Sequence, residues 1–126
     1  MKAITLLVLM AACASWTPDG AKLRDERVAD PALTTGGEIR GEMRDSRGEA
    51  MPGVTVVAAS PALGGKETVE LTDENGKYKL GPLPPGKYSI TFYFNESSYV
   101  HDGVDVRIGE AVVERVTGWR HSPPYR

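Results

Sequence analysis

A twenty-residue stretch, 39–58, constrains the fold most strongly. It alternates apolar and polar residues, passes through a polar turn and resumes as a β-branched run. Asp45 can hydrogen-bond its local backbone, and Gly48 permits the positive φ that closes a turn. Pro52 cannot donate to a strand ladder, so it marks a strand's first residue or edge, and the strand resumes at Val54. The stretch therefore predicts a strand, a tight turn and a second strand.

The alternation of apolar and polar side chains continues through the rest of the chain. Because side chains point alternately to the two faces of a strand, this period of two indicates half-buried strands. Seven segments show it: 39–43, 54–58, 67–71, 77–80, 87–94, 104–108 and 111–117. Seven short strands with turns between them, and no strong helical pattern, predict an all-β fold, a seven-stranded antiparallel β-sandwich.

The same alternation predicts which side chains face the core. The expected inward positions are Ile39, Gly41, Met43, Val54, Val56, Ala58, Val69, Leu71, Tyr78, Leu80, Tyr88, Ile90, Phe92, Phe94, Val104, Val106 and Ile108, with Leu83 at one end. In the last strand two inward faces fit the pattern: Val112 with Val116, or Val113 with Thr117. The segment 87–94 carries the largest aromatic content and is predicted to be a central strand.

The first twelve residues, 1–12, are predicted to be a signal peptide. Lys2 supplies a short positive region, and the apolar run that follows has the length of a signal-peptide core. Small residues then precede Cys13, which resembles the lipobox of bacterial lipoproteins and implies a lipid anchor at this Cys. Ala14 is not the Asp that retains such lipoproteins in the inner membrane, so the resemblance implies the bacterial outer membrane. A plain secretory signal cut near Ala12 or Ala14, which gives a periplasmic or secreted protein, is the alternative.

Polar segments flank the predicted domain. Residues 13–37 are rich in Pro, Gly and charged side chains and are predicted to be a flexible tether. Within them, 21–30 has the composition of two helical turns, but its two large apolar residues offer little surface for docking. The domain itself is expected at 38–117, and a basic, aromatic, Pro-rich tail at 118–126.

Composition excludes several classes of protein. The formal net charge is −2 at pH 7 and the charges of both signs are interspersed, so no basic face for nucleic acid is predicted. One Cys in 126 residues excludes an internal disulfide. After residue 13 no apolar run is long enough to span a bilayer as a helix.

Two motifs resemble the carboxypeptidase regulatory-like domain. The first is Ile39-x-Gly41-x-Met43-x-Asp45-x-x-Gly48-x-x-Met51-Pro52-Gly53-Val54-x-Val56, and the second is Thr72-Asp73-x-x-Gly76-x-Tyr78-x-Leu80-x-x-Leu83-x-Pro85-Gly86-x-Tyr88-x-Ile90. The resemblance covers nearly all of 38–117. It implies a transthyretin-like sandwich of the kind that accompanies carboxypeptidases, outer-membrane receptors and surface adhesins, and that is usually noncatalytic.

The residue inventory gives little support to an enzyme. A zinc carboxypeptidase needs His-x-x-Glu and a further His, whereas the two histidines, His101 and His121, form no such motif. No catalytic residue, metal ligand or cofactor is therefore predicted. The transthyretin-like resemblance leaves one remote enzymatic alternative, hydroxyisourate hydrolase, with His101 beside Asp102 as an acid–base group. The chain ends in Pro-Tyr-Arg without the Gly-Ser that follows in that enzyme, and His101 is otherwise predicted to be a solvated loop residue.

Two surface features remain as candidates for binding. Asp73 and its neighbours at the Asn75-Gly76 turn offer oxygen atoms, but the spacing is not that of a calcium loop, so a hairpin turn is predicted. Tyr93, Tyr99 and Trp119 form a possible ligand or partner surface, because Tyr93 is the outward residue in its strand.

The sequence thus predicts a noncatalytic envelope lipoprotein module with a structural or protein-interaction role. Its expected partners are the membrane, through the anchor, and an envelope protein that adds a strand to an exposed sheet edge. A carbohydrate- or peptide-binding module is the alternative, with a glycan as the possible partner.

Overall fold

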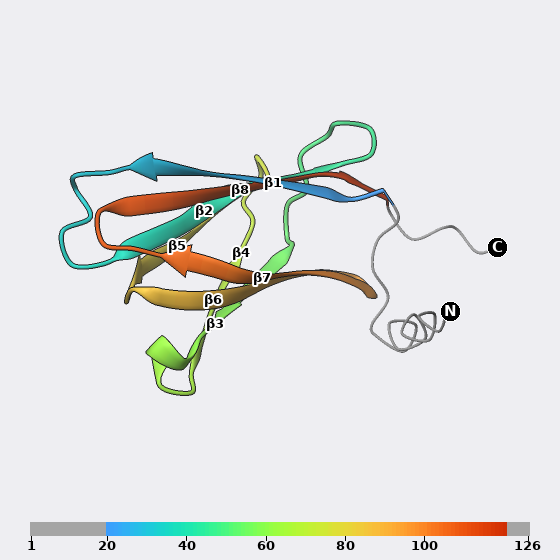
Figure 1. The fold of residues 1–126 in the computed structure, drawn as a ribbon. Coiled ribbons are helices and arrows are strands. Elements are labelled where there is room, and N and C mark those ends of the chain that lie inside the picture. The colour runs from blue at the N-terminus through green and yellow to red at the C-terminus, as the bar shows by residue number, and fades with distance from the viewer. Residues whose placement is uncertain (1–19, 121–126) are drawn as a thin grey trace, which may run out of the picture.

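Two four-stranded β-sheets pack face to face in the computed structural model, which describes residues 20–120 (Figure 1). The strands are β1 (Lys22–Ala29), β2 (Gly37–Asp45), β3 (Thr55–Ala59), β4 (Glu67–Leu71), β5 (Lys77–Leu83), β6 (Gly86–Phe94), β7 (Ser97–Val106) and β8 (Glu110–Trp119). A 3-10 turn, η2 (Pro61–Leu63), follows β3. The prediction of an all-β sandwich is confirmed.

The first sheet has the strand order β1-β8-β2-β5, and the second sheet has the order β4-β3-β6-β7. Among the described residues, neighbouring strands pair antiparallel with one exception, because β2 and β8 run parallel. Four strands lie at sheet edges: β1 and β5 in the first sheet, and β4 and β7 in the second. Both sheets are therefore open at both sides.

The strand β1 corrects the predicted tether. Residues 22–29 were expected to be flexible or to form helical turns, but they pair with β8 along their whole length, from Lys22 opposite Thr117 to Ala29 opposite Glu110. The sandwich therefore has eight strands rather than seven. The predicted tail is also shortened, because β8 continues through Trp119.

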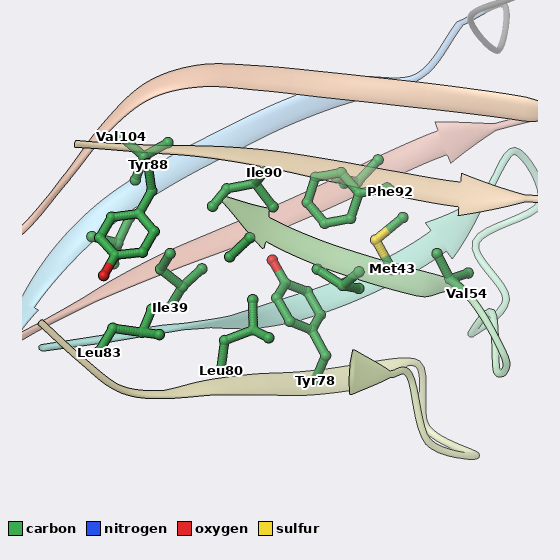
Figure 2. Packing of buried hydrophobic residues seen from close by; sticks show 14 of the residues in the cluster. Ile39, Met43, Val54, Tyr78, Leu80, Leu83, Tyr88, Ile90, Phe92 and Val104 are labelled. Carbon is green, nitrogen blue, oxygen red and sulfur yellow. The ribbon is translucent and has the colours of Figure 1, made fainter. Parts of the chain in front are cut away.

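The core lies between the two sheets, and Figure 2 shows side chains from both sheets meeting there. Its buried apolar members are Ile39, Met43, Met51, Val54, Val56, Ala58, Tyr78, Leu80, Leu83, Tyr88, Ile90, Phe92, Val104, Val106, Val112, Val116 and Trp119. Most of the predicted inward positions are among them. The choice in the last strand falls on Val112 with Val116, and Leu83 is buried as expected.

The strand β4 reverses its predicted orientation. Val69 and Leu71 were expected to face the core, but they are 52% and 59% exposed. Val69 lies opposite Val57 on β3, whose neighbours Val56 and Ala58 fill the core, so the pair points outward. Two other residues that were predicted to face inward differ as well. Ile108 is exposed, and Phe94 is only partly buried at the margin of the core.

Candidate functional site

The two motif aspartates shape turns rather than a reactive centre. Oδ1 of Asp45 accepts hydrogen bonds from the backbone amides of Arg47 and Glu49, both at 2.9 Å. Oδ1 of Asp73 accepts from the amides of Lys77 and Asn75, at 2.9 and 2.8 Å. These hydrogen bonds lower the pKa of the Asp73 carboxyl below its ordinary value, and the bond from the Lys77 amide has the largest effect on the pKa. The same oxygen therefore closes the hairpin that the Asn75-Gly76 dipeptide predicted.

A buried hydroxyl joins the two motifs. Oγ1 of Thr72 accepts a hydrogen bond from the amide of Val54 at 2.9 Å and donates one to the carbonyl of Met51 at 2.6 Å. It thereby satisfies the backbone on both sides of the Pro-Gly step before β3. Thr72, the first residue of the second motif, therefore stabilises the turn that belongs to the first motif.

Gly41 is required by a close approach between β2 and β8. A Cβ added at Gly41 would lie 1.7 Å from the backbone oxygen of Glu114, the residue opposite it in the parallel pair. On the other side of β2, Tyr78 lies opposite Gly41 and donates its hydroxyl to that same oxygen at 3.0 Å. Figure 2 shows this hydroxyl pointing into the space between the sheets. Burial raises the pKa of the Tyr78 phenol well above its ordinary value, and the nearby Glu114 carboxylate raises it further.

A His–Glu pair lies at the margin of the interior. Glu114 is fully buried, and its Oε2 lies 2.8 Å from Nδ1 of His101, which is half-buried. Burial raises the pKa of the Glu114 carboxyl, while the neighbouring His101 acts in the opposite direction and Asp25 adds to the rise. Donor atoms of Asp25, His101 and Glu114 all lie within 4.8 Å of one another. His101 was expected to be a solvated loop residue, with Asp102 as its partner only in the remote enzymatic alternative; the structure instead places it against Glu114 and near Asp25.

A bulge explains why the sequence placed His101 in a loop. Opposite β6, Tyr88 pairs with Val104 and Ile90 pairs with His101, so β7 contains one extra residue between these pairs. Gly103 adopts φ +72° at this point, which is the backbone conformation that such a bulge needs. The extra residue shifts the alternation, and His101 turns to the same side as the buried Val104. The only local signal for this shift is the Asp-Gly dipeptide, which also fits a turn.

The three predicted surface aromatics do not form one surface. Tyr93 points outward and is 48% exposed, as predicted. Tyr99 turns inward, where its ring meets Phe92 edge to face with 6.5 Å between centroids. Trp119 is fully buried in the core, so it contributes nothing to a surface. Of the three, Tyr93 alone stays available to a partner.

Tyr93 belongs instead to an apolar surface that the sequence did not predict. The outward positions of the second sheet form two rows, Leu71-Thr55-Tyr93 and Val69-Val57-Thr91-Val100. We name these seven residues the apolar face. Four of the five exposed large hydrophobic residues in the described chain, all except Ile108, lie on it. The reversed orientation of β4 therefore creates the surface.

The outer surface of the first sheet has the opposite character. Charged side chains cover it, and they include Glu38, Arg40, Glu42, Arg44, Lys77, Lys79 and Arg115. Ion pairs join several of them, the shortest being Arg40 to Glu38 at 2.8 Å. A shallow hollow of about 340 Å³ over β1, β8 and β2 is lined by charges of both signs. The two outer surfaces thus differ sharply in polarity.

The predicted lipidation site, Cys13, lies outside the described residues, as does the signal peptide at 1–12. Within residues 20–120, no helix has the length and hydropathy needed to cross a membrane.

The fold and its motif residues define a small β-sandwich whose signature side chains close turns and fit strands together. The chain belongs to the carboxypeptidase regulatory-like domain family, whose model matches residues 38–117. The strand β1 lies before this match, so the eighth strand is an addition to the matched region.

One curated relative is the TonB-dependent transporter Oar of Myxococcus xanthus. It is 35% identical to this chain over 60 residues, which are 47% of this chain and 6% of the transporter. The match therefore concerns a small part of a much longer protein.

Proposed function

We propose that this protein is a noncatalytic interaction module of the bacterial envelope that docks onto an outer-membrane protein through its apolar face. The observation that carries the proposal is the gathering of Val69, Leu71, Tyr93 and Val100 on one outer sheet surface. Apolar side chains that gather on one surface are characteristic of protein–protein interfaces. An aromatic residue among aliphatic ones is also typical of the centre of such an interface.

The choice of an outer-membrane protein as the partner rests on the relative. In the Myxococcus transporter the matching segment accounts for 6% of the chain, so there a module of this kind is part of a larger protein. We infer that the present chain carries a similar module. The edge strand β4 borders the apolar face, so a partner strand added there would extend both rows of outward side chains.

Membrane attachment is the second part of the proposal. We infer that Cys13 is lipidated, so that the sandwich is held at the outer membrane where its partner lies. The test is fractionation of cells that express the full chain and its Cys13→Ser variant. We expect the variant to move from the membrane fraction to the soluble periplasm. Membrane retention of the variant would contradict the anchor.

Site-specific photo-crosslinking in living cells tests the docking. A photoreactive residue is placed at Leu71 or Tyr93 on the apolar face, and at Lys79 on the charged surface as the matched control. We expect the first two positions to capture one and the same outer-membrane protein, identified by mass spectrometry, and the control to capture none of it. Equal capture from Lys79, or a crosslink to a second copy of this chain alone, would overturn the proposal. A glycan bound in a manner abolished by Tyr93→Ala would also overturn it.

A further inference from the structure

We propose that Asp25, His101 and Glu114 form a binding site for a divalent transition-metal ion, with Zn²⁺ as the best fit. The three side chains come from β1, β7 and β8 and converge where β1 and β7, the edge strands of the two sheets, border the core. Their donor atoms lie within 4.8 Å of one another. The site is distinct from the apolar face and does not depend on the proposed docking.

The burial of Glu114 gives the first argument. Its side chain is fully buried, and one oxygen, Oε1, has no hydrogen-bond partner among the described residues. A buried polar atom without a partner is costly, and a buried carboxylate normally neighbours a cation. His101 lies within hydrogen-bond distance of Oε2, so the other carboxylate oxygen, Oε1, is left without a partner. A metal ion held by this carboxylate would remove the deficit.

The charge balance gives the second argument. The side chain of Asp25 forms no ion pair within residues 20–120, although it faces Glu114 directly across the β1–β8 ladder. Two carboxylates side by side repel each other, and a single imidazole supplies at most one positive charge against their two negative charges. A divalent cation would neutralise both carboxylates and accept the imidazole as a third ligand.

The donor set selects the type of metal. An imidazole with two carboxylates suits Zn²⁺ and similar ions, whereas Ca²⁺ and Mg²⁺ prefer sites made of oxygen atoms. The ring nitrogen that faces Glu114 is Nδ1, so metal binding uses the tautomer that carries its proton on Nε2. Ligand atoms around zinc lie roughly 3.3–3.6 Å apart, given bonds of about 2.0–2.2 Å. The pair Nδ1 and Oε2, at 2.8 Å, would therefore open slightly, whereas the Asp25 oxygen would move toward them by roughly 1 Å at most. Asp25 is exposed and supplies that movement.

The site has a structural consequence. One ligand lies on β1, which precedes the matched family segment, and the other two lie on the sandwich proper. A bound ion would therefore fasten β1 to both sheets at once, in addition to its ladder with β8. We infer that the metal holds the N-terminal strand on the domain.

The test is titration of the full chain with ZnCl₂, with binding followed by calorimetry and thermal unfolding compared with and without EDTA. We expect one ion per chain and a higher midpoint of unfolding. The substitutions Asp25→Asn and Glu114→Gln should each weaken zinc binding about tenfold or more. Both are close in shape to the native side chains, so they should fold, which unfolding without metal verifies.

Matched controls separate this site from other zinc ligands in the sequence. Cys13→Ser, His121→Ala and Asp102→Asn should leave zinc affinity unchanged, because these residues lie outside the proposed set. Hydrogen exchange should slow in β1 on zinc addition and stay unchanged in β5, the opposite edge of the same sheet.

Three results would overturn the proposal. The first is the absence of zinc binding up to roughly 1 mM, where the free energy of binding is about −4 kcal/mol. The second is binding that survives Asp25→Asn and Glu114→Gln but disappears with Cys13→Ser or His121→Ala. The third is equal stabilisation by Ca²⁺ or Mg²⁺.

Discussion

At the scale of single residues, the motif side chains act on backbone geometry. Asp45, Thr72 and Asp73 satisfy turn amides, and Gly41 allows two strands to approach closely. Tyr78 then crosses Gly41 and binds the carbonyl that this approach brings within reach. The contacts of these motif side chains thus serve the fold.

Replacement of Gly41 by Ala should destabilise the domain by about 3 kcal/mol. The new methyl group would meet the Glu114 carbonyl at 1.7 Å, and a backbone atom within a ladder cannot move aside cheaply. Denaturant unfolding of the variant and the native chain measures the difference. Gly48→Ala is the matched control, because its φ of +81° is strained but no atom lies within 4 Å. It should cost only about 1 kcal/mol, and equal losses in both variants would contradict the steric explanation.

Tyr78 should make the stability of the protein fall at alkaline pH. Its folded-state pKa is raised above the ordinary value of 10.0, so above that pH the unfolded chain releases the phenolic proton while the folded chain retains it. The unfolded state then binds fewer protons, and the free energy of unfolding declines as pH rises. Tyr78→Phe should flatten this decline, at a cost of about 1 kcal/mol at neutral pH from the lost hydrogen bond.

Chemical denaturation at a series of pH values from neutral to alkaline measures the slope for Tyr78→Phe. Tyr93→Phe serves as the control, because Tyr93 is exposed, and it should leave the slope unchanged. A slope that is the same in the native chain and in Tyr78→Phe would refute the assignment.

At the scale of strands, the sequence predicts local features well and long-range ones poorly. Turn residues and the period of two locate β2 to β6 and β8 within a few residues, whereas β7 begins at Ser97, well before the predicted segment 104–108. The period alone cannot say which face is inward, so β4 was assigned the wrong face. The segment that forms β1 offers one large apolar residue on each face, Leu23 and Val28, and its partner β8 lies about ninety residues away. Pairing across such a distance leaves no local signal.

The candidate metal site was unpredictable for the same reason. Its three ligands come from three strands, one of which the sequence did not reveal, and a bulge at Gly103 shifts the alternation between His101 and Val104. Trp119 was misplaced because the last strand runs two residues beyond the predicted domain end.

The strand β1 should be the first part of the sheet to open in the metal-free protein. It is an edge strand with one neighbour, and its exposed side chains contribute little burial. Local opening is easiest where backbone hydrogen bonds lack buried side chains around them. We expect amide exchange measured by mass spectrometry in the presence of EDTA to be faster in β1 than in β2. Equal protection of the two strands would show that β1 belongs to the same cooperative unit as the core.

At the scale of the whole molecule, the two outer surfaces differ in polarity. One carries charges of both signs, and the other carries the apolar face on the second sheet. Leu71→Thr should change the free energy of unfolding by no more than about 0.5 kcal/mol, because the side chain is already exposed. Ile90→Thr on the inner side of the same sheet should cost about 2 kcal/mol or more.

Thermal and denaturant unfolding of these two variants tests the assignment of faces. Because Leu71 lies on the apolar face, we also expect the folded Leu71→Thr variant to bind less of a hydrophobic dye than the folded native chain does. A loss of stability in Leu71→Thr comparable to that in Ile90→Thr would show that β4 packs its apolar residues inward after all.

The pairing of β1 with β8 also decides how such a unit can be built into something larger. Lys22 lies opposite Thr117, and Figure 1 shows the described chain entering and leaving on the same side. Polypeptide can therefore be joined before and after the sandwich without being pulled across it. A fold with this property can be spliced into another protein as a side branch and leave the path of the host chain almost undisturbed.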